Sequence, residues 1–115
     1  MNNDRPIGIF DSGIGGLTVA KAIIEELPHE SIIYLGDTAR IPYGTRSREV
    51  ITKFALELVR LLLQKNVKCL VVACNTISAN ALEAIKKVSP VPVIDVILPT
   101  FEEVSSQGRV GVIGT

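Results

Sequence analysis

The side chains best suited to chemistry lie in three short polar stretches, two of them directly after apolar runs of the sequence. Their members are Asp11, Ser12, Tyr43, Gly44, Cys74, Asn75 and Thr76. A carboxylate, a thiol, hydroxyl groups and backbone N–H groups can bind a small charged molecule and exchange protons with it. We therefore take a small-molecule site as the first hypothesis.

Cys74 is the strongest candidate for a reactive group. It directly precedes a segment with helical spacing, and a thiol at a helix N-terminus is expected to carry a larger thiolate fraction. Asn75 and Thr76 can cap that helix or bind a substrate carboxylate. The alternative is a buried structural cysteine, the commoner fate of a lone thiol. Cys69 fits that alternative, because its odd separation from Cys74 places it on the opposite face of a strand.

Residues 11–16, with the sequence Asp-Ser-Gly-Ile-Gly-Gly, join an apolar run to a helical segment. Glycines allow the backbone to approach a ligand, and a helix N-terminus offers free N–H groups to an anion. A dinucleotide fingerprint fails because Thr18 occupies its third glycine position. Asp37, after the second apolar run, resembles a ribose-binding acid, so a nucleotide-binding module remains an alternative. Asp11 can also be a simple helix N-cap.

Residues 40–44 form a predicted loop in which Ile41 is held extended by the following proline. Tyr43 and the Gly44 N–H can line a pocket there, and an ordinary turn is the alternative. His29 is expected at the surface. No His, Cys, Asp and Glu residues have metal-ligand spacing, so we expect no metal.

The elements that must position these residues alternate along the chain. Apolar runs at 7–11, 32–37, 69–74, 92–96 and 110–114 indicate strands of a parallel sheet covered on both faces. Helical spacing at 17–27, 51–62 and 81–88, and more weakly at 101–107, indicates the connecting helices. This alternation predicts an α/β fold, a doubly wound, mostly parallel five-stranded sheet flanked by helices. Because ligands bind at the carboxyl ends of such strands, Asp11, Tyr43 and Cys74 should meet there.

The composition argues against nucleic acid and membrane partners. Of the 115 residues, 47 % are hydrophobic, and 12 basic residues balance 12 acidic ones. No basic patch indicates a nucleic acid partner, and no apolar run approaches the roughly 20 residues that span a membrane. If the apolar run holding both cysteines is a strand, they lie roughly 16 Å apart, too far for a disulfide. Free thiols indicate a cytoplasmic protein.

Four blocks resemble glutamate racemases of the aspartate/glutamate racemase family: residues 7–19, 34–44, 73–76 and 110–115. They occur in the family's order and cover essentially the whole chain. The resemblance implies a cytoplasmic enzyme that interconverts L- and D-glutamate without pyridoxal phosphate or metal and supplies D-glutamate for peptidoglycan. One departure is Thr100, which stands after Pro99 where the family commonly has glycine.

The resemblance also assigns roles. It implies that Cys74 is one of two catalytic thiols, and that the substrate-binding residues are Asp11, Ser12, Tyr43, Gly44, Asn75 and Thr76. In the family the second thiol lies in a second domain. We therefore expect residues 1–115 to be an N-terminal domain, a fragment without that second domain. A racemase for aspartate or another amino acid, a non-catalytic fragment and a homodimer remain open.

Overall fold

The computed structural model describes residues 3–97, 99, 103, 108–109 and 111. Its described strands form one parallel sheet in the order β2-β1-β3-β4. The strands are β1 (Ile7–Asp11), β2 (Ile32–Gly36), β3 (Cys69–Val72) and β4 (Val93–Asp95). The helices are α1 (Leu17–Glu26), α2 (Arg48–Gln64) and α3 (Asn75–Val88), with a short 3-10 helix η1 (Thr38–Arg40) after β2.

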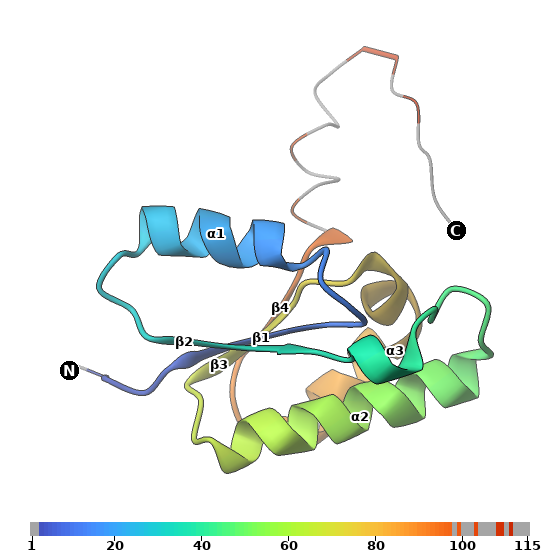
Figure 1. Cartoon of the computed structure of the whole chain (residues 1–115), viewed down its shortest axis with the longest axis horizontal. Helices are drawn as coiled ribbons and strands as arrows, with labels where there is room; N and C mark the ends of the chain where they lie inside the picture. Colours follow the sequence, from blue (N-terminus) through green and yellow to red (C-terminus); the bar gives the residue numbers. More distant parts are fainter. Residues whose placement is uncertain (1–2, 98, 100–102, 104–107, 110, 112–115) are drawn as a thin grey trace.

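The helices cover the sheet from both sides, as Figure 1 shows, with α1 on one face and α2 and α3 on the other. Each face has its own apolar cluster. Phe10, Leu70 and Val72 point toward α2 and α3, whereas Ile9 and Val71 point toward α1. This alternation follows from the two-residue period of a strand. It is what makes the apolar runs of β1 and β3 continuous rather than alternating with polar residues.

The two cysteines lie on opposite sides of the sheet, as their spacing predicted. Cys74 belongs to the cluster beneath α2 and α3, and Cys69 packs against the cluster beneath α1. Both thiols are free. A disulfide between them is thereby excluded by the sheet itself.

The predicted doubly wound parallel fold is confirmed, with small shifts at its boundaries. The third strand ends at Val72 rather than at Cys74, because Cys74 is the N-cap of α3. Helix α3 begins at Asn75, earlier than the predicted 81, and α2 begins at Arg48, where the Ser47 hydroxyl accepts from the Val50 N–H at 3.2 Å. Four of the five predicted strands are observed. The fifth, at 110–114, and most of the fourth helix, at 101–107, lie outside the described residues.

The loop between β1 and α1 packs closely on the neighbouring strands through two glycines. A Cβ atom on Gly36, at the end of β2, would lie 2.2 Å from the carbonyl oxygen of Gly13. A Cβ atom on Gly16 would lie 2.9 Å from the Cβ atoms of both Asp11 and Ala73. Such distances are too short for real contacts, so only glycine permits this packing.

Gly36→Ala should therefore destabilise the chain, by about 1–3 kcal/mol, because the new methyl group meets backbone rather than a movable side chain. Gly15→Ala is the matched control, since its Cβ would lie 3.8 Å from the Asp11 carboxylate, an ordinary contact. Urea unfolding of both variants measures the difference in free energy of unfolding. Equal stability of the two variants would contradict the close approach.

Candidate functional site

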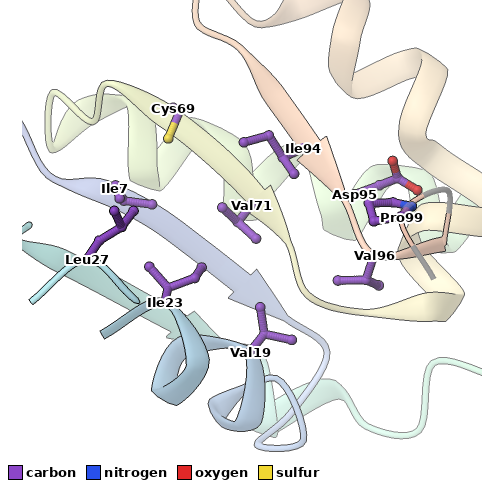
Figure 2. A pocket seen from close by; sticks show the side chains of 10 residues that line it. All are labelled: Ile7, Val19, Ile23, Leu27, Cys69, Val71, Ile94, Asp95, Val96 and Pro99. Atoms are coloured by element: carbon purple, nitrogen blue, oxygen red, sulfur yellow. The ribbon is translucent and has the colours of Figure 1, made fainter. Parts of the chain in front are cut away.

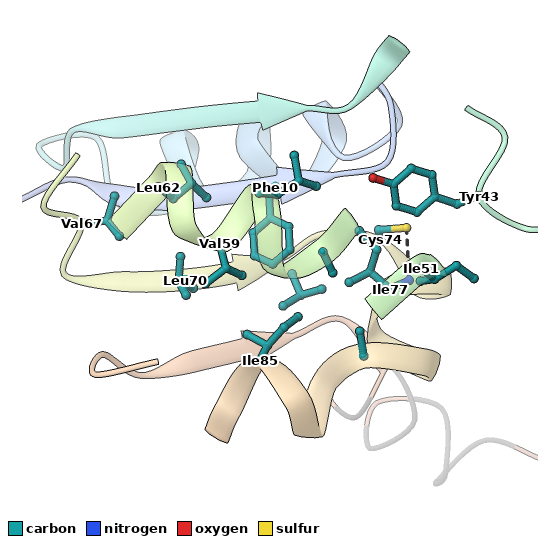
Figure 3. Close-up of a cluster of buried hydrophobic side chains, with 14 residues drawn as sticks. Phe10, Tyr43, Ile51, Val59, Leu62, Val67, Leu70, Cys74, Ile77 and Ile85 are labelled. Atoms are coloured by element: carbon teal, nitrogen blue, oxygen red, sulfur yellow. Dashed lines mark hydrogen bonds between the residues drawn. The ribbon is translucent and has the colours of Figure 1, made fainter. Parts of the chain in front are cut away.

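The three polar stretches meet at the carboxyl edge of the sheet. The Cys74 thiol lies 3.4 Å from the Ser12 hydroxyl, which brings the end of β3 against the end of β1. Tyr43 joins the same buried cluster as Cys74, and Figure 3 shows its ring beside the sulfur. The prediction that Asp11, Tyr43 and Cys74 lie together at the carboxyl ends of the strands is confirmed for their positions.

Cys74 itself caps helix α3. Its extended backbone (φ −119°, ψ 123°) turns the sulfur back over the first turn, where the Ile77 N–H donates to Sγ at 3.4 Å (Figure 3). Of the two roles considered for Asn75 and Thr76, helix capping is taken by the Cys74 thiol, which accepts this N–H. Asn75 is exposed and Thr76 half-buried at the helix N-terminus. A helix N-terminus favours negative charge, so the site suits a thiolate or a carboxylate.

Asp11 organises the loop after β1. Its Oδ1 accepts from the Ser12 N–H at 2.7 Å, and its Oδ2 accepts from the Gly16 N–H at 2.6 Å. The N-cap of α1 is Gly16 rather than Asp11, so the simple capping role is not the one observed. Asp11 as a whole is 5 % exposed, and its two bonds to N–H groups of the same loop hold the loop in a closed turn.

Tyr34, in β2, was not among the predicted site residues. Its hydroxyl lies 3.0 Å from the Gly13 carbonyl oxygen and 3.4 Å from Asp11 Oδ2. Burial, followed by the Asp11 charge and hydrogen bond, raises the pKa of Tyr34 to about 12. The sequence did hold a sign of this role: Tyr34 is a tyrosine within an apolar strand, and a buried tyrosine needs a hydrogen-bond partner for its hydroxyl.

Tyr43 is held by its hydroxyl rather than left free for a ligand. The ring is 2 % exposed, and the hydroxyl donates to Asp37 Oδ2. Burial, then this bond, raises the pKa of Tyr43. Asp37 also accepts from Arg40 Nε at 2.5 Å, so its side chain supports the loop. The Asp37 carboxylate is therefore already bound by Tyr43 and Arg40, which argues against the ribose-binding role considered for it. Gly44, next to Tyr43, is exposed.

Two arginines complete the support of this loop. Arg40 reaches Glu57 in α2, and its guanidinium carbon lies 3.9 Å from the centre of the Phe54 ring. Arg46 approaches the same ring at 5.2 Å. Cation–π contacts of this kind fix the loop against α2. Ile41 is extended, as predicted, and joins Pro42 through a cis peptide bond.

An apolar groove lies away from this edge, beside α1 (Figure 2). It has a volume of about 440 Å³ and is lined mainly by aliphatic side chains of β1, α1 and the β3–β4 region, with Cys69 and Asp95 at its margin. Neither Asp11 nor Cys74 lines it. A large apolar pocket is the usual first choice for a binding site. Here the carboxylate, thiol, hydroxyl and helix N-terminus that can bind and deprotonate an amino acid together lie at the carboxyl edge instead, so we place the candidate site there.

The described part of the chain offers neither a metal site nor a membrane-spanning helix. Within it, no three His, Cys, Asp or Glu side chains are grouped to hold a metal ion. None of its helices has the length and apolar character needed to cross a membrane. His29 is exposed, as predicted.

Residues 7–115 match the family model of Asp/Glu/hydantoin racemases. Glutamate racemase from Geobacter metallireducens is 55 % identical over 114 residues, which are 96 % of this chain and 42 % of that protein. Two solved racemases superpose on the fold. The Aquifex pyrophilus glutamate racemase has a TM-score of 0.88 and 53 % identity, over 90 % of this chain and 41 % of that one. The Francisella tularensis glutamate racemase, solved with D-glutamate, has a TM-score of 0.84 and 52 % identity, over 88 % of this chain and 39 % of that one.

The fold, the edge site and the family match define an α/β racemase domain: the chain belongs to the Asp/Glu/hydantoin racemase family. It spans about two-fifths of the length of the glutamate racemases that it matches.

Tyrosine ionisation tests the buried phenols. The chain has two tyrosines and no tryptophan, so near-ultraviolet absorbance reports tyrosinate cleanly. The folded chain should form little tyrosinate near pH 10, where the tyrosines of the unfolded chain are half ionised. In Tyr43→Phe only Tyr34 remains, so a single ionisation should be seen at a pH of about 12. Since the raised pKa lets the unfolded chain lose protons first, the free energy of unfolding falls as pH rises from 10 to about 12.

The fall in the free energy of unfolding between pH 10 and about 12 should be shallower in Tyr34→Phe, because that variant keeps only one tyrosine with a raised pKa. Chemical unfolding at several alkaline pH values measures the slope in both proteins. Identical slopes in wild type and Tyr34→Phe would contradict the burial of the Tyr34 hydroxyl.

Proposed function

We propose that this chain is the N-terminal domain of a glutamate racemase, in which Cys74 exchanges the α-proton on one face of the substrate. One observation carries the proposal: the Cys74 sulfur lies at the N-terminus of α3, with the Ile77 N–H and the Ser12 hydroxyl both at 3.4 Å. The sulfur thus lies between the N-terminus of a helix and a loop that can bind the amino acid.

The chemistry requires proton removal from one face of the α-carbon and proton return to the other. A thiolate acting as base and a thiol acting as acid on opposite faces accomplish this without moving the substrate. In our proposal Cys74 is one of the pair. Cys69 is not the other, because it lies on the far side of the sheet, where burial raises the pKa of its thiol.

The remaining residues bind the substrate in this proposal. The Asp11 carboxylate lies close to the α-ammonium group. Hydrogen-bond donors for the substrate carboxylates, which also stabilise the carbanionic transition state, come from Ser12, Asn75, Thr76 and the backbone at Tyr43 and Gly44. The buried ring of Tyr43 contributes by fixing the backbone of its loop, since its hydroxyl is bound to Asp37.

The second thiol is proposed to come from a second domain, consistent with the two-fifths of the relatives' length that this chain spans. By family resemblance, the complete enzyme works in the cytoplasm without a cofactor and supplies D-glutamate for peptidoglycan. Glutamate is favoured over aspartate because the similar proteins named here are glutamate racemases.

Alkylation of the folded chain tests the site. Iodoacetamide should label Cys74 before Cys69, although Cys74 is the more buried, because Cys74 lies at a helix N-terminus whereas burial raises the pKa of the Cys69 thiol and lowers its thiolate fraction. L-glutamate at about ten times its Kd should slow Cys74 labelling about tenfold, whereas NAD and ATP should not. Mass spectrometry follows both sites, with Cys69 as the internal control. Earlier labelling of Cys69, or protection by a nucleotide, would count against the proposal.

The 115-residue chain should not racemise glutamate by itself. Proton return needs a group at roughly 3 Å from the second face, and the other thiol is on the opposite side of the sheet. Circular dichroism of L-glutamate incubated with the chain should therefore stay constant. In a complete parent enzyme, Cys74→Ala should abolish racemisation. Loss of optical activity that depends on Cys74 in the short chain would instead indicate a homodimer with two facing copies of Cys74.

A further inference from the structure

The Tyr34 hydroxyl joins two oxygen atoms of the loop between β1 and α1. It lies 3.0 Å from the Gly13 carbonyl oxygen and 3.4 Å from Asp11 Oδ2. Tyr34 belongs to β2, so these contacts come from a neighbouring strand and not from the loop itself. The Gly13 carbonyl can reach this place because Gly36 has no side chain to block it.

The single phenol proton has two possible acceptors here. A phenol donates one hydrogen bond, and the shorter distance assigns that bond to the Gly13 carbonyl. The longer contact to Asp11 is the weaker of the two. Because the pKa of Tyr34 is raised to about 12, the hydroxyl remains a donor throughout the neutral range.

The Asp11 carboxylate has capacity left for a ligand. Its two oxygens offer about four acceptor positions. The N–H groups of Ser12 and Gly16 occupy two of them with short bonds, at 2.7 and 2.6 Å. The other contacts, from the hydroxyls of Ser12 and Tyr34, are both 3.4 Å long. An ammonium group can take the place of the long contact from the Ser12 hydroxyl while the two short bonds keep the carboxylate in place.

We propose that Tyr34 is a positioning residue: by donating to the Gly13 carbonyl it holds that carbonyl beside the Asp11 carboxylate, and the two oxygens receive the α-ammonium group of the amino acid. This rests on the proposed function, in which Asp11 receives that group. An ammonium has three donors and can bind two neighbouring oxygens at once. The pair thus selects α-amino acids over acids of the same shape that lack the amine.

Tyr34→Phe removes the hydroxyl and keeps the ring. We expect it to weaken binding of L-glutamate to the 115-residue chain about tenfold, the effect of losing one hydrogen bond that supports a charged contact. Binding of glutarate, which lacks the ammonium group, should change less than about twofold. Chemical-shift titration of the ¹⁵N-labelled chain measures both affinities. Tyr34→Gln, which restores a donor, should recover part of the affinity for glutamate.

Thr18→Val is the matched control. The Thr18 hydroxyl donates to the Gly15 carbonyl at 2.9 Å, so its loss removes a hydroxyl–carbonyl bond of the same loop without touching Asp11. This variant should bind both ligands as wild type does. Equal weakening of glutamate and glutarate by Tyr34→Phe would overturn the proposal, since it would show a general loosening of the site.

Hydrogen exchange of the Ser12 and Gly16 amides separates this inference from the proposed function. If wild-type chain binds neither ligand, the proposed binding role fails, and the amides then decide the part played by Tyr34. Faster exchange of both amides in Tyr34→Phe, but not in Thr18→Val, supports positioning of the loop at Gly13 by the phenol. Unchanged exchange overturns it. If Tyr34→Phe does not fold, the same comparison is made with Tyr34→Gln, where exchange like that of wild type supports the need for a donor and faster exchange overturns it.

Discussion

The hydrogen bonds that Asp11 accepts from its own loop are the interaction on which the site depends. A buried carboxylate is costly unless it is paired or hydrogen-bonded, and the N–H groups of Ser12 and Gly16 meet that need at 2.7 and 2.6 Å. The same two bonds fold the loop back over the sheet edge. Folded in this way, the loop places the Ser12 hydroxyl against Cys74 and the Gly13 carbonyl against Tyr34. Without the carboxylate, neither neighbouring strand would meet the loop at these points.

The strand order explains why these neighbours are available. Strand β1 lies between β2 and β3, so the loop that follows it has one neighbour on each side. Strand β2 supplies Tyr34, and the turn after β3 supplies Cys74. A parallel sheet aligns the carboxyl ends of all its strands at one edge, and residues far apart in sequence therefore converge there. The chemistry of the site thus follows from topology before any single side chain is considered.

Much of this arrangement could be read from the sequence, because it depends on periodicity and strand ends. The spacing of Cys69 and Cys74 predicted their opposite faces, and the apolar runs predicted the edge where Asp11 and Cys74 meet. Three features could not be predicted. The thiol of Cys74 as its own helix cap, the bond between Tyr43 and Asp37, and the place of Tyr34 each depend on side-chain orientations. Such orientations are set by tertiary packing rather than by a local pattern. The fifth predicted strand, at 110–114, stays a prediction.

The stacking of Arg40 and Arg46 on Phe54 has a consequence for how much the sequence can vary. Phe54 lies in α2, so the loop that bears Tyr43 and Gly44 takes its position from that helix as well as from the sheet. Each residue advances a helix by 1.5 Å and rotates it by about 100°. A single deletion early in α2 would turn Phe54 away from both arginines even if every residue of the edge site were retained. The number of residues between the loop and Phe54 is therefore constrained by these contacts, in addition to the identity of the residues at the edge.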